Sequence, residues 1–160
     1  LFGKRVGKCD PRMVAMGAVD EFNAALGLVR VAGLADELEK IIDGVQGVLV
    51  GLMGELATLP EDRQRYIEAG YPVVEEASVE EITQHIHTLE AEGLSFSGWV
   101  RPGASHNEAA ARLDQARTVC RRAEREVLAL SDEVGNSELT RYLNRASDLM
   151  WVLARKVEGE

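Results

Sequence analysis

The chain of 160 residues is long enough for one domain with a sizeable hydrophobic core. Aromatic residues make up only 5% of it against 46% apolar residues overall, so aliphatic side chains and alanine must fill the core. This composition favours an all-α protein. The formal net charge of −9 argues against general binding to nucleic acid or to an anionic membrane surface, but it does not exclude a local anion site.

The two cysteines, Cys9 and Cys120, show no spacing typical of a zinc site or of a secreted disulfide framework. Cys120 falls on the apolar seam of a predicted helix, where a buried small hydrophobe is expected rather than a nucleophile. We therefore expect a cytoplasmic, reducing setting and no metal ligands. The longest uncharged run of the most apolar helix, residues 44–54, is too short to span a bilayer.

The first predicted helix begins at Asp10-Pro11, an N-cap acceptor followed by proline at the first helical position, and runs to about Val31. From Met13 onward this helix contains only three charged residues, so we expect it to be buried on most sides. Asp20 would then need a partner within packed surface. The alternative is a solvent-facing or capping carboxylate.

Apolar residues repeat at steps of four and three from Leu38 to Leu59 and predict a second long helix, with Asp36 as its N-cap. The same helix carries a stripe of four glycines, at positions 44, 47, 51 and 54. Each glycine inside a helix costs about 0.5–1 kcal/mol relative to alanine. The stripe therefore predicts the close approach of another helix, or else of a partner subunit or a ligand.

Residues 60–77 lack a clear period and form the longest connection, where we expect an insertion or disorder. Capping-box patterns beginning at Ser78 and Ser105 predict the starts of the third and fourth helices. Gly135-Asn136-Ser137 separates the fourth helix from the fifth, which spans residues 139–157. Because the other connections are short, the sequence predicts a single-domain, up-and-down bundle of five helices.

A glycine-rich loop over residues 93–105 precedes the fourth helix and contains Phe96 and Trp99. These aromatic side chains either plug the end of the bundle or face a ligand. The fourth helix itself is unusually basic. Its Arg117, Arg121 and Glu124 share one strip beside the apolar seam, with two further arginines, 122 and 125, pointing outward.

One interpretation of this basic strip is a solvated face with local Arg–Glu pairs. The other is an anion site, because 14 of the 18 basic residues are arginine. The rigid fork of donors on arginine suits phosphate and carboxylate groups.

Five blocks of sequence carry a distinctive combination of residues: Arg5–Lys8, Gly17–Ala24 with Leu26-Gly27, Gly54–Thr58, Ala116–Arg125 and Tyr142–Leu149. In this order they resemble the all-helical, trimeric family of ATP:cob(I)alamin adenosyltransferases of the propanediol-utilisation (PduO) type. The resemblance covers nearly the whole chain, so residues 1–160 are identified as a single domain of this kind. We expect the family's Thr-Gly-Asp-rich segment, which wraps the ATP phosphates, to be missing before Leu1.

The resemblance implies that the Co(I) centre of reduced cobalamin attacks the 5′ carbon of ATP, which forms adenosylcobalamin and releases triphosphate. Such a reaction needs positioning, charge stabilisation and a dry corrinoid pocket rather than a protein nucleophile. It further implies Mg²⁺ with ATP, a homotrimer with sites between subunits, and a cobalamin reductase or an adenosylcobalamin-dependent mutase as partner. The alternative is a non-enzymatic trimeric bundle that binds or carries corrinoid.

The matching positions also imply individual roles. Six residues would bind ATP, and Arg121 among them would contact the phosphates. The six are Arg121, Arg122, Glu124, Arg125, Asn144 and Lys8. Asp20 and Arg117 would bridge subunits beneath the corrinoid and, with Arg121, would make up the catalytic set. Trp99 stands where the family has the phenylalanine that helps to displace the lower axial ligand of cobalt. The chain departs from the family pattern there, at Pro102-Gly103-Ala104 and at Asp114-Gln115.

Overall fold

The computed structural model describes residues 2–94 and 100–159 and shows, in these ranges, helices without strands. The five long helices are α1 (Pro11–Val31), α2 (Asp36–Leu56), α4 (Glu76–Ala91), α5 (Glu108–Leu128) and α7 (Glu138–Glu158). The short ones are the 3₁₀ turn η1 (Pro60–Asp62), α3 (Arg63–Glu68) and α6 (Ser131–Val134). The predicted bundle of five principal helices is confirmed.

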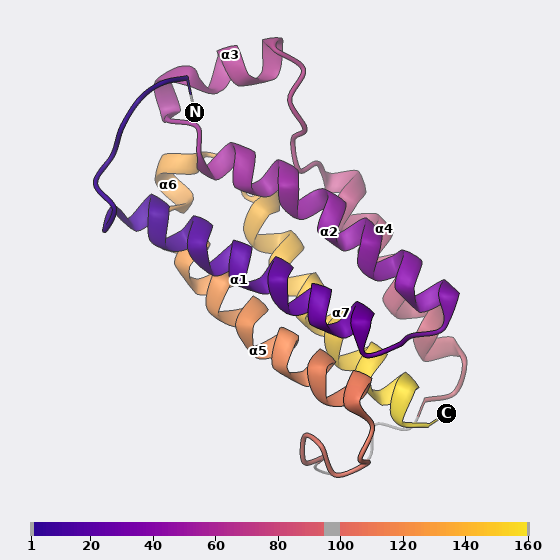
Figure 1. Ribbon diagram of the computed structural model, residues 1–160. Coiled ribbons are helices and arrows are strands. Elements are labelled where there is room, and N and C mark those ends of the chain that lie inside the picture. Colours follow the sequence, from indigo (N-terminus) through magenta and orange to yellow (C-terminus); the bar gives the residue numbers. More distant parts are fainter. Residues whose placement is uncertain (1, 95–99, 160) are drawn as a thin grey trace.

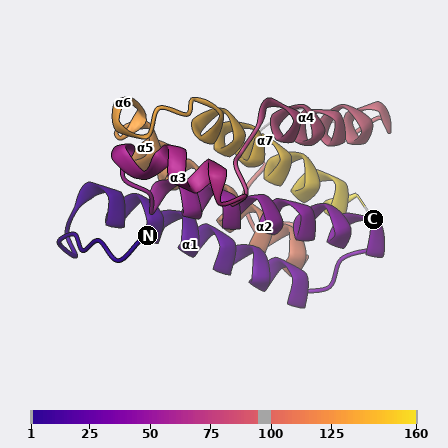
Figure 2. The same cartoon turned by 90° about the horizontal axis from the view of Figure 1, so that it is seen from above.

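Successive long helices run in alternating directions along the bundle (Figure 1). α5 packs against both α1 and α7, α2 packs on α1, and α4 packs on α7, whereas α2 and α4 touch each other little. Seen from above, α4 and α7 lie side by side (Figure 2). Buried side chains occur along all of α7, from Leu139 to Val157, so this last helix is the centre of the core.

The start of α1 follows the sequence prediction, because the Asp10 carboxylate accepts a hydrogen bond from the backbone N–H of Arg12 at 2.9 Å. The fourth helix of the prediction, α5, begins where expected but with a different cap. Its N-cap is Asn107, whose side-chain oxygen accepts from the Ala110 N–H at 3.1 Å. Ser105 lies two residues before that cap, so the predicted capping box was out of register.

The predicted caps of α2 and α4 were wrong. The N-cap of α2 is Ala35, and Asp36 is the first helical residue. An acid in the first turn stabilises a helix through the helix dipole. Asp36 therefore still marks the start of α2, although it lies one residue after the N-cap. Similarly, α4 begins at Glu76, and Ser78 lies inside the helix.

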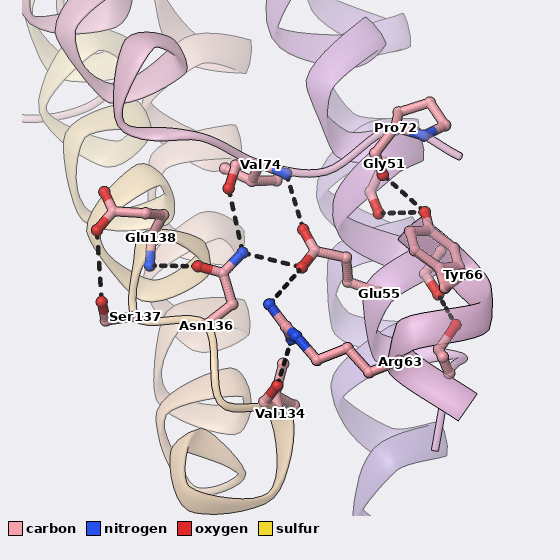
Figure 3. A network of polar contacts seen from close by, with 12 residues as sticks. Gly51, Glu55, Arg63, Tyr66, Pro72, Val74, Val134, Asn136, Ser137 and Glu138 are labelled. Atoms are coloured by element: carbon pink, nitrogen blue, oxygen red, sulfur yellow. Dashed lines mark hydrogen bonds and ion pairs between the residues drawn. The ribbon is translucent and has the colours of Figure 1, made fainter. Parts of the chain in front are cut away.

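The disorder expected over residues 60–77 is not found, because this connection folds into η1 and α3 and is fixed by a buried carboxylate (Figure 3). Glu55, on α2, is only 5% exposed. It accepts hydrogen bonds from the Val74 backbone N–H at 2.7 Å and from the Asn136 side chain at 2.9 Å. Arg63 lies 3.6 Å from Glu55 and donates to the Val134 carbonyl at 2.6 Å. One carboxylate thereby joins α2, the connection and the turn before α7.

The glycine stripe of α2 divides into two parts. A Cβ at Gly51 would lie 3.1 Å from Pro72, and one at Gly54 would collide with the Tyr66 hydroxyl. Close approach therefore does explain these two glycines, although the connection rather than another helix makes the approach. Gly44 and Gly47 have no such neighbour within 4 Å.

Among residues 2–94 and 100–159, no single helix combines the length and apolarity needed to cross a membrane. α2 passes that test only jointly with Pro60–Glu68, across a bend of 110°.

The packing of Tyr66 on α2 predicts opposite effects of two alanine substitutions. Gly54→Ala should lower the free energy of unfolding by about 1–3 kcal/mol, because the new methyl displaces a buried tyrosine whose hydroxyl donates to the Pro72 carbonyl at 2.7 Å. Gly47→Ala, in open space on the same helix, should raise it by about 0.5–1 kcal/mol. Urea unfolding followed by circular dichroism measures both, and equal effects would contradict the close approach.

Candidate functional site

The basic strip of α5 forms one wall of a groove of about 300 Å³ that lies over α7. We call it the arginine groove. It is lined by residues of α4, α5 and α7: Ile86, Glu90, Arg117, Arg121, Arg145, Ser147, Asp148, Trp151 and Val152. Two arginines of the predicted site, Arg117 and Arg121, therefore share one cavity with the polar strip of the last helix.

A second hollow of about 540 Å³ adjoins the arginine groove and shares Arg145 with it. Its α7 wall contains Asn144, and its α4 wall contains His87. Asn144 donates a hydrogen bond from its side-chain amide to the Glu124 carboxylate at 2.9 Å. The fold thus brings two members of the predicted ATP set together from α5 and α7, although 20 residues separate them.

The other arginines of the strip lie differently. Arg122 forms an ion pair with Glu21 of α1, and both side chains are about half exposed. Arg125 donates to the backbone carbonyl of Arg121 at 2.9 Å. A solvated face with local pairs describes Arg122 well, whereas Arg117 and Arg121 line the groove.

Arg117 holds an unsatisfied donor. Its Nε is buried and has no hydrogen-bond partner among the described residues. A buried donor without an acceptor costs about 1–3 kcal/mol, and more on a charged group.

The remaining predicted residues lie outside this cluster or outside the described residues. Asp20 is exposed on α1, so the prediction that it sits in packed surface is wrong for the single chain. Apolar content could not distinguish a core helix from a helix with an uncovered apolar face, which is what α1 has. Lys8 is exposed in the segment before α1. Trp99 and Phe96 fall within residues 95–99, which the structure does not describe.

Sequence reasoning missed Trp151, which contributes an aromatic wall to the arginine groove. The guanidinium carbon of Arg155 lies 5.9 Å from the centroid of its ring. Arg155 is held by a buried ion pair with Asp114 of α5 at 2.9 Å. No local signal in the sequence marks Trp151 as part of the groove, because the groove is formed by three helices that are distant along the chain.

Cys120 is fully buried, as predicted, and its S–H points to the Leu143 carbonyl 3.2 Å away. Burial, with a smaller contribution from Glu124, raises the pKa of this thiol far above its usual range, so it is not a thiolate nucleophile. Within the described ranges, no three histidine, cysteine, aspartate or glutamate side chains gather into a metal site.

Comparison with known proteins places the chain in a family. The family model for cobalamin adenosyltransferases matches residues 1–157. The chain belongs to this family. It is 35% identical to the corrinoid adenosyltransferase PduO of Salmonella typhimurium, over 99% of the chain and 46% of that protein. It is 36% identical to a cobalamin adenosyltransferase of Cupriavidus metallidurans, over 96% of the chain and 78% of that protein. The chain thus spans about half the length of the PduO relative.

Solved structures agree with the family. A variant of the PduO-type ATP:corrinoid adenosyltransferase of Lactobacillus reuteri, complexed with cobalamin and ATP, superposes with a TM-score of 0.84 at 28% identity. The match covers 99% of this chain and 87% of that one. Another variant of that protein, complexed with ATP, gives a TM-score of 0.86 at 25% identity, with the same coverage.

The buried ion pair of Asp114 and Arg155 predicts a large loss of stability when only one partner is removed. Arg155→Met should lower the free energy of unfolding by about 3–5 kcal/mol, because Asp114 is left as an uncompensated buried charge. The double variant Asp114→Leu/Arg155→Met should recover most of this loss.

Arg112→Met on α5 is the matched control, because its pair with Glu108 is exposed and contributes at most about 1 kcal/mol. Urea denaturation midpoints compare the three variants. Equal destabilisation by Arg155→Met and Arg112→Met would refute the role of the buried pair.

Proposed function

We propose that the protein transfers the 5′-deoxyadenosyl group of ATP to cob(I)alamin, forming adenosylcobalamin and releasing triphosphate. Family membership supports this reaction. The observation in the chain itself that carries it is the gathering of Arg117, Arg121, Glu124 and Asn144 on the face that α5 and α7 share. Because Co(I) is itself the nucleophile, the protein needs to contribute position and charge, which this groove is built to do.

In this proposal Arg121 stabilises the charge that develops on the departing triphosphate, and Asn144 with Glu124 orients the nucleotide. Lys8, Arg122 and Arg125 complete the nucleotide contacts from the edges of the site. Mg²⁺ accompanies ATP, held mainly by the phosphates and water, as suits an ion that keeps much of its hydration shell. Trp99 faces the corrinoid as the counterpart of the family's phenylalanine.

We further propose a homotrimer with its sites between subunits. α1 supports this, because its exposed face repeats at steps of three and four and is largely apolar or small: Val14, Gly17, Glu21, Ala24, Leu28 and Val31. Exposed apolar faces of this kind mark interaction surfaces. Asp20, next to this face, would form the bridge to Arg117 of the neighbouring subunit.

The cellular setting and partner proteins are also part of the proposal. Both cysteines are free, in accord with a reducing cytoplasm. A cobalamin reductase would supply the Co(I) substrate, and an adenosylcobalamin-dependent mutase would receive the product.

The test of the proposed activity uses the purified protein with ATP, magnesium and chemically reduced cobalamin, and follows the cobalamin spectrum for adenosylcobalamin. Arg121→Ala should weaken ATP affinity about 10- to 150-fold, which corresponds to the about 1.5–3 kcal/mol of one charge-assisted contact. Arg112→Ala, on the same helix but outside the groove, should leave ATP affinity unchanged.

Binding of corrinoid without formation of adenosylcobalamin would refute the enzyme assignment and favour a carrier bundle. Unchanged ATP affinity in Arg121→Ala would instead show that the arginine strip is a solvated face.

The subunit bridge predicts a different pattern for Asp20→Asn. This change keeps the size of the side chain but removes the charge that would meet the neighbour's guanidinium. The substitution should impair the use of corrinoid, or lower the stability of the trimer, more than it lowers the affinity for ATP. Kinetics with each substrate varied in turn, together with light scattering for the oligomeric state, measure the difference. Wild-type cobalamin kinetics in an intact trimer would refute the bridge.

A further inference from the structure

A second groove lies between α2 and α4 and shares no lining residue with the arginine groove. We call it the α2–α4 groove. Its volume of about 450 Å³ falls within the range of about 300–1,000 Å³ that is usual for small-molecule sites. Its walls are mainly aliphatic, with Ile41, Val45 and Val48 from α2 and Ile82 from α4. The groove exists because these two helices touch each other little.

Tyr142 of α7 lines this groove from the core side and is only 2% exposed. Among the described residues, no group forms a hydrogen bond with its hydroxyl. Burial, and to a lesser extent Glu81, raises the pKa of this phenol, so the hydroxyl stays protonated and is available as a donor. The other buried tyrosine, Tyr66, by contrast donates to the Pro72 carbonyl at 2.7 Å. The Tyr142 hydroxyl is therefore left to donate to an acceptor in the groove, which Tyr142 lines.

Charge around the groove favours an uncharged occupant. Its polar lining combines two acids, Glu37 and Glu81, with Lys40 and His85. The two carboxylates would repel an anion and the lysine would repel a cation, whereas neither repulsion acts on a neutral molecule. Gly44 keeps the α2 wall open, because no atom lies within 4 Å of the place that its Cβ would occupy.

We propose that the α2–α4 groove binds a small, uncharged and largely apolar molecule that presents one hydrogen-bond acceptor to the Tyr142 hydroxyl. The aliphatic walls hold the body of this ligand and the phenol fixes its orientation. The site is separate from the nucleotide and corrinoid site, so it does not depend on the proposed transferase activity.

The test uses the fluorophore 6-propionyl-2-(dimethylamino)naphthalene, which is uncharged, has an aromatic body and carries one ketone acceptor. The wild-type protein should bind it saturably, with a blue shift of its emission. Gly44→Leu should abolish this binding, because the new side chain fills the groove. Gly47→Leu is the matched control and should bind normally, since Gly47 is an exposed glycine of the same helix that does not line the groove. Tyr142→Phe should weaken binding about 2- to 10-fold, the loss expected for one neutral hydrogen bond.

The proposal is overturned if the wild-type protein shows no saturable binding or if Gly44→Leu binds as the wild type does. If Tyr142→Phe binds the fluorophore as tightly as the wild type does, the phenol does not anchor the ligand. Displacement of the probe by saturating ATP and cobalamin would place it in the arginine groove instead, which also contradicts the proposal. Retention of the probe under those conditions, together with the expected effects of the variants, supports it.

Discussion

The candidate site depends on how closely α5 packs against α7. The residues of α5 that face the core here are small, Ala116, Cys120 and Ala123, and all three are fully buried. The Cys120 sulfur lies within 3.2 Å of a backbone carbonyl of α7, which shows how near the two helices come. Because small residues let the helices approach, polar side chains that flank this seam on the two helices reach each other, as Glu124 and Asn144 do. A larger residue in the seam would separate the two halves of the groove.

The same packing divides the arginines of α5 by role. One side of the helix turns to α7 and α4 and lines the arginine groove, and the other side turns to α1, where Arg122 meets Glu21. A short stretch of basic residues can therefore serve the ligand and the helix bundle at once. Arg117 lies on the groove side, where the proposed neighbour would complete the site.

The long helices could be predicted because apolar residues repeat along them at steps of three and four, and because Asp10-Pro11 is a strong local start signal. Contacts between residues that are distant along the chain could not be predicted. Glu55 meets Asn136 across 81 positions, and Asp114 meets Arg155 across 41, and neither pair leaves a local pattern. The exposure of Asp20 was missed because an apolar helix can be covered by its own chain or by another. The residues of the arginine strip were identified from composition and resemblance, whereas Trp151 emerged only when α4, α5 and α7 were placed together.

The burial of Cys120 also makes the chemistry of the two thiols unequal. A maleimide or an iodoacetamide reacts with thiolate, and Cys120 is both inaccessible and held protonated, whereas Cys9 is exposed. Mild labelling of the native chain therefore marks Cys9, directly beside Lys8 in the segment that leads into α1. The protein carries, without any engineering, a single attachment point for a spectroscopic probe at the edge of the proposed nucleotide site.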